Sequence, residues 1–331
     1  MYKNPSGPAR TAITASLDSP EAYPGTVMFI SGPEKHCGKT TFMNRAMLLA
    51  RRGTTMAGKA PPAVMTVGYD GEVRDYLTGV RKPAVPISCG DVFVTAERFL
   101  RQSGTCPEIL DVAPGAGVLG RLCIARASRD GVVALVGPEG NKAVAWILES
   151  LVEGGLADTV LVDGAINRIT QAASRSSARF VYVLRVDRAG LHRAVDRVCR
   201  IGALMALPMA QPGAWSATGS AAGKDGQLDD NHAGGPVYLE GALTRETAAR
   251  IPEELRSVIV EDFTKIFLDR MELAAFTRER GLFVARQIDF AGFVVNCRGI
   301  SEVEFIRTLA DQDLAAQVCF NPYRSLPWRA A

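Results

Sequence analysis

The sequence lacks the features that mark membrane and nucleic-acid-binding proteins. No apolar stretch approaches the roughly 18–20 residues that a membrane-spanning helix needs. The net charge is only +3, and no block of basic residues alternates with aromatic ones. We therefore expect neither a membrane nor a nucleic acid among the partners of this protein.

Cysteine is present, but without the spacing of a metal site or a redox motif. The seven cysteines are odd in number and contain no C-x-x-C pair, and the three histidines are scattered. Such a pattern is typical of reduced thiols in a cytoplasmic protein. The cysteines are Cys37, Cys89, Cys106, Cys123, Cys199, Cys297 and Cys319.

Short apolar runs alternate with helical patterns from residue 27 onward. This order predicts an α/β fold, doubly wound around a mainly parallel sheet. Residues 1–24 hold Pro, Ser and Ala without a continuous apolar run, and we expect them to form a flexible extension. Residues 25–331 are then long enough for one large domain.

The predicted elements can be placed along the chain by their apolar patterns. Strands are expected at residues 27–30, 63–67, 90–94, 108–112, 159–163, 180–186, 236–239, 258–260, 282–284 and 293–296, with a strand end at 264–268. Helices are expected at residues 40–51, 96–102, 141–153, 191–205, 269–279 and 302–310, with a further helix opening at 244.

Two segments depart from the regular alternation. Residues 120–125 and 131–137 predict two strands joined by a turn, which could form a hairpin. Residues 211–235 are rich in Gly, Ser and Ala, which predicts a long flexible insertion. A loop of this length is either disordered or functional, for example as a lid or a partner-binding loop.

One loop carries the strongest functional signal. The segment from residue 30 to 41 reads ISGPEKHCGKTT and lies between an apolar strand and a helical stretch. Strand, loop with Gly-Lys-Thr, then helix is the context of a phosphate-binding P-loop, or Walker A motif. Main-chain N–H groups of such a loop bind phosphate oxygens, and the helix N-terminus adds positive potential. We expect the nucleotide to contact Gly32, Lys35, His36, Cys37, Gly38, Lys39, Thr40 and Thr41.

Within this loop, Lys39 is expected to reach the β- and γ-phosphates, and the Thr40 hydroxyl to bind Mg²⁺. The loop departs from the usual pattern because Pro33 stands where a glycine is common, and proline lacks an N–H donor. The alternative interpretation is a chance Gly-Lys-Thr at a helix start. Cys37 is interpreted as a small packing residue, with a redox-sensitive thiol as the alternative.

A second anion for the metal is expected at the end of a neighbouring strand. Asp163 closes the apolar run at residues 159–162 and is our candidate for binding Mg²⁺, directly or through water. The alternative is an aspartate that only caps the next turn. Arg168 follows on the ligand side of the sheet and could contact phosphate, an acidic partner or a surface carboxylate.

Polar residues also follow the second predicted strand. Asp70 and Glu72 would lie on the same edge of the sheet, where a residue could sense the γ-phosphate or orient water. Thr66 is an alternative sensor. A plain polar turn around Gly68 and Gly71 is the competing interpretation of this segment.

Several phrases in a fixed order resemble a known family. They are GKTT at 38–41, VGYDGE at 67–72, GDVFVTA at 90–96, LVGP at 135–138, LVDGA at 161–165 followed by Asn167 and Arg168, and FVVN at 293–296. Together they are similar to the KamB-like P-loop reactivase subunits of adenosylcobalamin-dependent lysine and ornithine aminomutases. The resemblance covers about residues 25–325 apart from the insertion. It implies a factor that uses ATP to release damaged cobalamin from a mutase, with a second subunit.

The residues themselves support a broader set of functions. The leading hypothesis is a P-loop NTPase that binds Mg²⁺ and ATP and acts as a switch on a protein client or second subunit. GTP remains possible, although no Asn-Lys-x-Asp motif is present. The alternatives are an ATP-dependent small-molecule kinase or ligase on the same fold, and a nucleotide-binding scaffold that has lost catalysis. Lys39, Asp70 and Asp163 are the expected catalytic residues.

Overall fold

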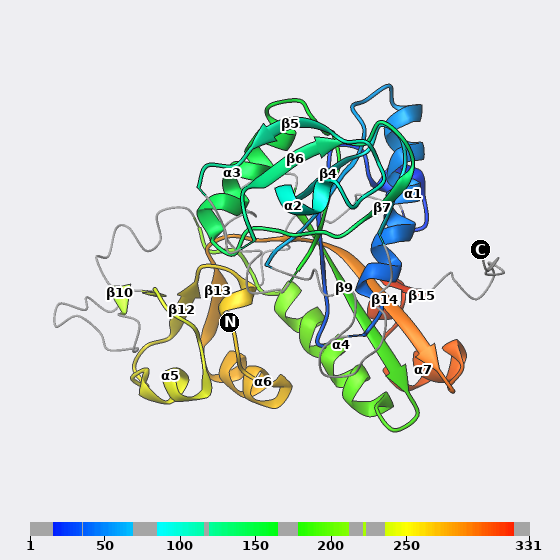
Figure 1. Ribbon diagram of the computed structural model, residues 1–331. Helices are drawn as coiled ribbons and strands as arrows, with labels where there is room; N and C mark the ends of the chain where they lie inside the picture. The colour runs from blue at the N-terminus through cyan, green and yellow to red at the C-terminus, as the bar shows by residue number, and fades with distance from the viewer. Residues whose placement is uncertain are drawn as a thin grey trace.

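A computed structural model of the protein describes residues 16–34, 36–68, 85–115, 119–164, 178–211, 221–222 and 236–320. Across these residues, none of the helices combines the length and apolar character needed to traverse a bilayer. The polypeptide folds around one large sheet and one smaller sheet, with helices packed against them (Figure 1).

Within the part of the chain that the structure describes, the large sheet has nine strands, and most of them are parallel. Their order across the sheet is β15-β14-β9-β1-β8-β2-β4-β6-β5, and only β6 runs antiparallel to its neighbours β4 and β5. The strands are β1 (Val27–Ser31), β2 (Ala63–Thr66), β4 (Val92–Ala96), β5 (Glu108–Val112), β6 (Leu122–Arg126), β8 (Val160–Asp163), β9 (Ala178–Asp187), β14 (Asp289–Arg298) and β15 (Val318–Phe320).

Helices cover both faces of this sheet, which is the arrangement of a doubly wound α/β fold. The side chains of β1 alternate between two apolar clusters: Val27 and Phe29 belong to one, Met28 and Ile30 to the other. The first cluster includes the buried faces of α3 (Asn141–Val152) and α4 (Leu191–Met205), and the second that of α1 (Lys39–Met56). The α/β fold with a large, mainly parallel sheet expected from the sequence is confirmed.

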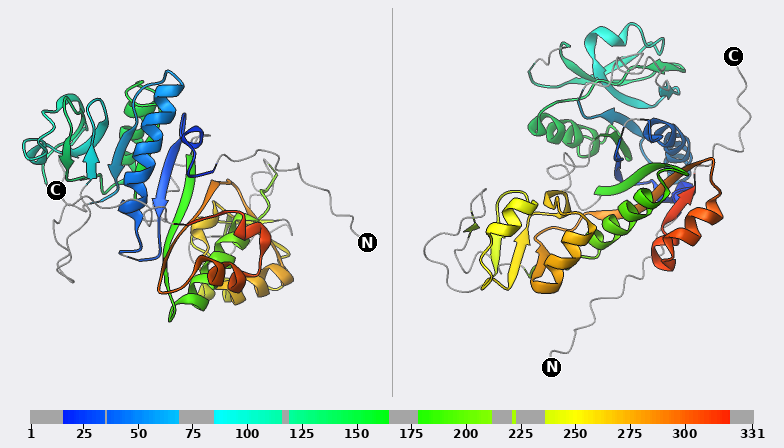
Figure 2. Two further views of the ribbon diagram at one scale, coloured as in Figure 1. Left: turned by 90° about the vertical axis from the view of Figure 1, so that its right-hand side faces the viewer. Right: turned by 90° about the horizontal axis from the view of Figure 1, so that it is seen from below.

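The smaller sheet was not foreseen as a separate unit. It is fully parallel, with the order β10-β11-β12-β13, and is built from β10 (Ala221–Ala222), β11 (Val237–Leu239), β12 (Ser257–Val260) and β13 (Gly281–Val284). The helices α5 (Arg245–Arg250) and α6 (Arg270–Glu279) connect its last three strands. In Figure 2 this yellow-to-orange region lies away from the cyan strands β4 to β6.

The small sheet and the large sheet share one core. Phe180 at the start of β9 contacts Phe263 and Phe290, with ring centroids 5.5 and 5.6 Å apart. Val258 and Val260 of β12 belong to the same apolar cluster as β1 and β9. The remaining elements are η1 (Pro20–Ala22), β3 (Val85–Ile87), α2 (Glu97–Leu100), β7 (Gly131–Val133), η3 (Phe263–Lys265), α7 (Glu302–Leu309) and α8 (Gln312–Ala315).

Three expectations need correction. The hairpin between residues 120–125 and 131–137 is wrong, because β6 pairs with β4 and β5, whereas β7 pairs with β3 in a separate two-stranded sheet. The strand end expected at residues 264–268 is largely the 3₁₀ helix η3. Only Ile266 makes an isolated bridge, to Leu243.

The third correction concerns the N-terminal extension. Residues 1–15 lie outside the described residues, but from residue 16 the chain packs onto the α1 side of the sheet. Leu17 and Tyr23 are buried there, and the Tyr23 hydroxyl donates a hydrogen bond of 2.7 Å to the Leu17 carbonyl. The packed part of the chain therefore begins before residue 25. The insertion expected at 211–235 lies outside the described residues, apart from Gln211 and β10.

Candidate functional site

The loop between β1 and α1, residues 32–38, lies at the carboxyl end of a central strand. β1 lies between β8 and β9. The next strand of this sheet in the chain, β2, lies on the β8 side of β1, whereas the chain crosses to the other side after β8 to form β9. Ligands of open α/β sheets bind at such switch points, beyond the carboxyl ends of the strands. We call this segment the β1–α1 loop.

The first turn of α1 has no side chain at the N-cap position to cap its N–H groups. The N-cap residue is Gly38, which has no side chain to cap the helix and takes a positive φ of 106°. No acidic residue stands in the first turn, and the helix begins directly with Lys39, Thr40 and Thr41. An 18-residue helix that starts in this way offers donors and a positive potential to an anion.

Close packing explains why glycine begins this loop. A Cβ on Gly32 would collide with the carbonyl oxygen of Val183 in β9 and would lie 2.6 Å from Cys37 Sγ. The loop therefore folds tightly against the neighbouring strand, with the Cys37 thiol beneath it. Cys37 is buried, as expected of a packing residue, and burial raises the pKa of its thiol.

Lys39 turns back over the loop. Its ammonium Nζ donates a hydrogen bond of 2.9 Å to the Glu34 carbonyl and lies 3.7 Å from Cys37 Sγ. The side chain is only partly buried. The cation thus lies directly over the β1–α1 loop, where it can meet an anion held by the loop.

Asp163 lies beside this loop at the same edge of the sheet. It is the last residue of β8 and pairs in register with Ile30 on one side and Thr66 on the other. Its alternation with Leu161 places it on the face of the sheet that α1 covers. The side chain is only 7% exposed, so a buried carboxylate and the start of α1 share one face and one edge.

A strap at residues 137–138 clamps the end of β2 next to Asp163. Val67 N donates a hydrogen bond of 2.9 Å to the Asp163 carbonyl. Gly68 N donates to the Pro138 carbonyl at 2.9 Å, and Gly137 N donates back to the Gly68 carbonyl at 3.1 Å. A Cβ on Gly137 would collide with the Thr66 carbonyl oxygen, so only glycine fits in this strap.

The opposite face of the same edge carries a buried hydroxyl and a buried phenol. Ser31 pairs in register with Tyr182 of β9. Ser31 Oγ is buried without a hydrogen-bond partner among the residues that the structure describes. Burial raises the pKa of Tyr182 from 10.0 to about 12, partly offset by the positive charge of Arg197.

This shift has a measurable consequence for stability at alkaline pH. The unfolded chain releases the tyrosine proton near pH 10, whereas the folded protein keeps it until about 12. The free energy of unfolding should therefore fall by about 1 kcal/mol between about pH 9 and about pH 11, and further as the pH rises towards 12. In Tyr182→Phe this part of the fall should be absent. Urea unfolding of both proteins at about pH 9 and about pH 11 measures it, and equal falls in the two proteins would contradict the assignment.

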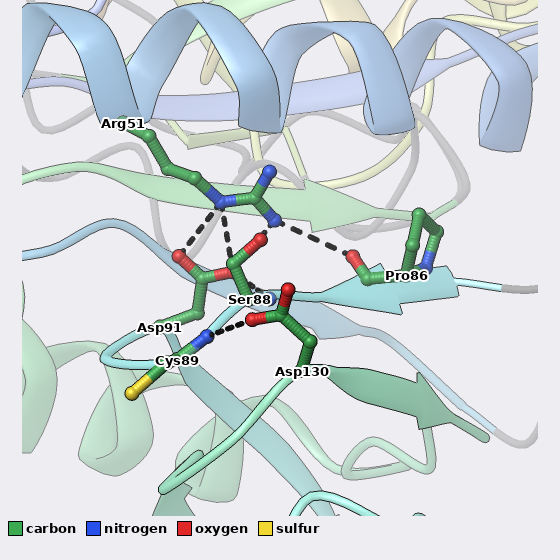
Figure 3. Close-up of polar contacts among 6 residues, drawn as sticks. All are labelled: Arg51, Pro86, Ser88, Cys89, Asp91 and Asp130. Atoms are coloured by element: carbon green, nitrogen blue, oxygen red, sulfur yellow. Dashed lines mark hydrogen bonds and ion pairs between the residues drawn. The ribbon is translucent and has the colours of Figure 1, made fainter.

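A buried ion pair fixes the middle of α1 to the rest of the fold. Figure 3 shows Arg51 of α1 directed at Asp91, just before β4: its Nε lies 2.9 Å from both carboxylate oxygens and its Nη2 lies 2.6 Å from Oδ2. Ser88 N donates a further bond of 2.7 Å to Asp91 Oδ2. Arg51 also reaches the Pro86 carbonyl at 3.4 Å. The helix that begins at the β1–α1 loop is thus held in place about three turns further on.

Among the described residues, the structure brings together those that the sequence predicted at the phosphate and cation site. Gly32, His36, Cys37, Gly38, Lys39, Thr40 and Thr41 lie in the β1–α1 loop or the first turn of α1, with Asp163 on the adjacent strand β8. Lys35, Asp70, Glu72 and Arg168 lie outside the described residues.

One neighbour of the loop received no role from the sequence. Asn296 stands near the end of β14, and its amide Nδ2 is 3.4 Å from where a Cβ on Gly38 would lie. β14 and β9 continue past the end of β1, which carries this amide to the helix start. The sequence did offer a signal for this residue, because Asn296 is a polar residue directly after the apolar run at 293–295.

The donor set at this edge suits a hard cation. The Thr40 hydroxyl and the Asp163 carboxylate are oxygen ligands of the kind that Mg²⁺ takes in proteins. Among the described residues, no group of three or more His, Cys, Asp or Glu side chains could hold a metal. A cation here would therefore draw its remaining ligands from a bound phosphate and water.

Comparisons of the chain with protein-family models, curated proteins and solved structures found no match. The class that the fold defines is thus that of α/β proteins with a large, mainly parallel sheet.

Proposed function

We propose that this protein is a P-loop NTPase that binds a nucleoside triphosphate with Mg²⁺ in the β1–α1 loop. The observation that carries the proposal is the position of Asp163: it ends the strand next to β1, in register with Ile30, on the face covered by α1. A phosphate loop with an adjacent strand-end aspartate is the recurring arrangement of such proteins.

Each residue has a defined role in this proposal. The N–H groups of the β1–α1 loop and the first turn of α1 bind the phosphates, and Lys39 leaves the Glu34 carbonyl to contact the β- and γ-phosphates. Thr40 and Asp163 hold the cation. Bound Mg²⁺ supplies positive charge that offsets the charge of the phosphates. Arg168 is proposed as a further phosphate contact and Asp70 as a residue that orients water.

The proposed reaction is hydrolysis of the terminal phosphate. A water oxygen forms a bond to the γ-phosphorus while the bond from that phosphorus to the bridging oxygen breaks. The products are the nucleoside diphosphate, inorganic phosphate and the proton that the water loses to solvent. Lys39 stabilises the negative charge on the transferred group. Hydrolysis is proposed to switch a protein client. The family resemblance suggests a cobalamin-dependent aminomutase as that client and ATP as the nucleotide.

Titration calorimetry with ATP and with GTP, in the presence and absence of Mg²⁺, tests the proposal. We expect binding that Lys39→Ala weakens about fivefold or more, the effect of losing one charge-assisted hydrogen bond of about 1 kcal/mol. Lys59→Ala is the matched control, because Lys59 is an exposed lysine just past the other end of α1. If neither nucleotide binds the wild type under either condition, the proposal is wrong.

A further inference from the structure

Thr66 occupies a special position next to the candidate cation site. It is the last residue of β2, pairs in register with Asp163, and is only 4% exposed. Its alternation with Val64 places it on the face of the sheet that α1 covers, which is also the face of Asp163. The two side chains are therefore neighbours on the same face of adjacent strands.

The hydroxyl of Thr66 donates its only proton in a hydrogen bond to the main chain. Oγ1 donates a hydrogen bond of 3.1 Å to the carbonyl oxygen of Asp163. A threonine hydroxyl has one donor and two acceptor lone pairs. While this bond persists, Thr66 cannot donate to a phosphate oxygen and can only accept from another donor. This argues against a direct contact between Thr66 and the γ-phosphate, one way in which the sequence could have been interpreted.

The main chain on either side of the Thr66 side chain is held by several hydrogen bonds. The hydrogen bond from Val67 N to the Asp163 carbonyl lies beside that of Thr66 Oγ1, so one oxygen receives both donors. The strap at residues 137–138 then holds Gly68 by two main-chain hydrogen bonds and packs directly on the Thr66 carbonyl. The end of β2, which carries Oγ1, is thus held next to Asp163.

We infer that Thr66 is a positioning residue that accepts a hydrogen bond from a water ligand of the divalent cation. The inference rests on the proposed function, because the cation is expected only with bound nucleotide. Mg²⁺ releases its water reluctantly and commonly keeps several water ligands in protein sites. Such a water is a strong donor, and an acceptor that has no proton left to donate is its natural partner.

The test separates the effect of Mg²⁺ from nucleotide binding itself. Thr66→Val removes the hydroxyl but keeps the shape, whereas Thr66→Ser keeps the hydroxyl. Thr159→Val is the matched control, because Thr159 is fully buried at the opposite end of β8 and also donates to a main-chain carbonyl, that of Tyr23, at 2.9 Å. Titration calorimetry measures the affinity of each protein for ATP and GTP over a series of Mg²⁺ concentrations and with a chelator.

We expect Mg²⁺ to strengthen nucleotide binding by the wild type, Thr66→Ser and Thr159→Val to a similar extent. In Thr66→Val this gain should shrink about three- to tenfold, the scale of one hydrogen bond, while the affinity in chelator stays within about twofold. An unchanged gain in Thr66→Val, or an equal loss in Thr159→Val, would overturn the inference and leave the proposed function intact. Absence of nucleotide binding by the wild type would refute both.

Discussion

Replacing Asp91 by alanine is expected to lower the free energy of unfolding by about 3–5 kcal/mol, the usual cost of removing one partner from a buried ion pair. The side chains of Asp91 and Arg51 are only 3% and 21% exposed. Alanine would leave the Ser88 amide without this acceptor and would leave the Arg51 guanidinium with its long 3.4 Å contact to the Pro86 carbonyl. Urea unfolding followed by circular dichroism measures the loss.

The matched control is an ion pair on the surface. Arg121 and Glu97 lie 3.1 Å apart, but their side chains are 60% and 53% exposed. Glu97→Ala should therefore change the free energy of unfolding by less than about 1 kcal/mol. If Asp91→Ala costs no more than Glu97→Ala, the Arg51–Asp91 pair does not fix α1 as described.

The second large effect is expected at Gly137. In Gly137→Ala the new Cβ would collide with the Thr66 carbonyl, which is main chain and part of the sheet, so either the strap or the end of β2 must shift. We expect a loss of about 3 kcal/mol or more, at the upper end for overpacking of a buried site. The variant should also lose part of the Mg²⁺-dependent gain in nucleotide affinity, because the end of β2 carries Thr66.

Gly140→Ala is the control for this change. Gly140 has an ordinary φ of −99°, and no atom lies within 4 Å of the place that a Cβ would take, although this residue is only three positions further along the chain. Because Gly140 is the N-cap residue of α3, its substitution should cost no more than about 1 kcal/mol. Thermal unfolding of the two variants side by side measures the difference. Equal melting temperatures would show that the strap accommodates the added methyl group without loss of stability.

The central strands could be predicted from the sequence because their signal is local. A strand buried on both faces is apolar along its length, and β1 and β8 are such runs. Which strands pair with one another was harder to predict from the sequence. β6 has a neighbour in sequence on each side, and it pairs with β5, the strand before it, and with β4, whereas β7 pairs with β3. The apolar pattern of β6 does not show which of its two neighbours it joins.

The same distinction applies to the candidate site. The β1–α1 loop is continuous in sequence, so Gly38 and Lys39 could be identified directly. Asp163 could be inferred because it ends an apolar run. The strap around Gly137 and the hydrogen bond from Thr66 to the Asp163 carbonyl join segments about 70 to 100 residues apart. No local sequence pattern predicts such contacts.

The place of β1 in the sheet has a consequence for the order in which the chain can acquire its structure. β1 is synthesised well before both of its neighbours, because Val27 pairs with Val160 on one side and Ala178 on the other. The nascent β1 and its loop therefore have no partner strand until these later segments have been made. Contacts of such long sequence separation make folding slow.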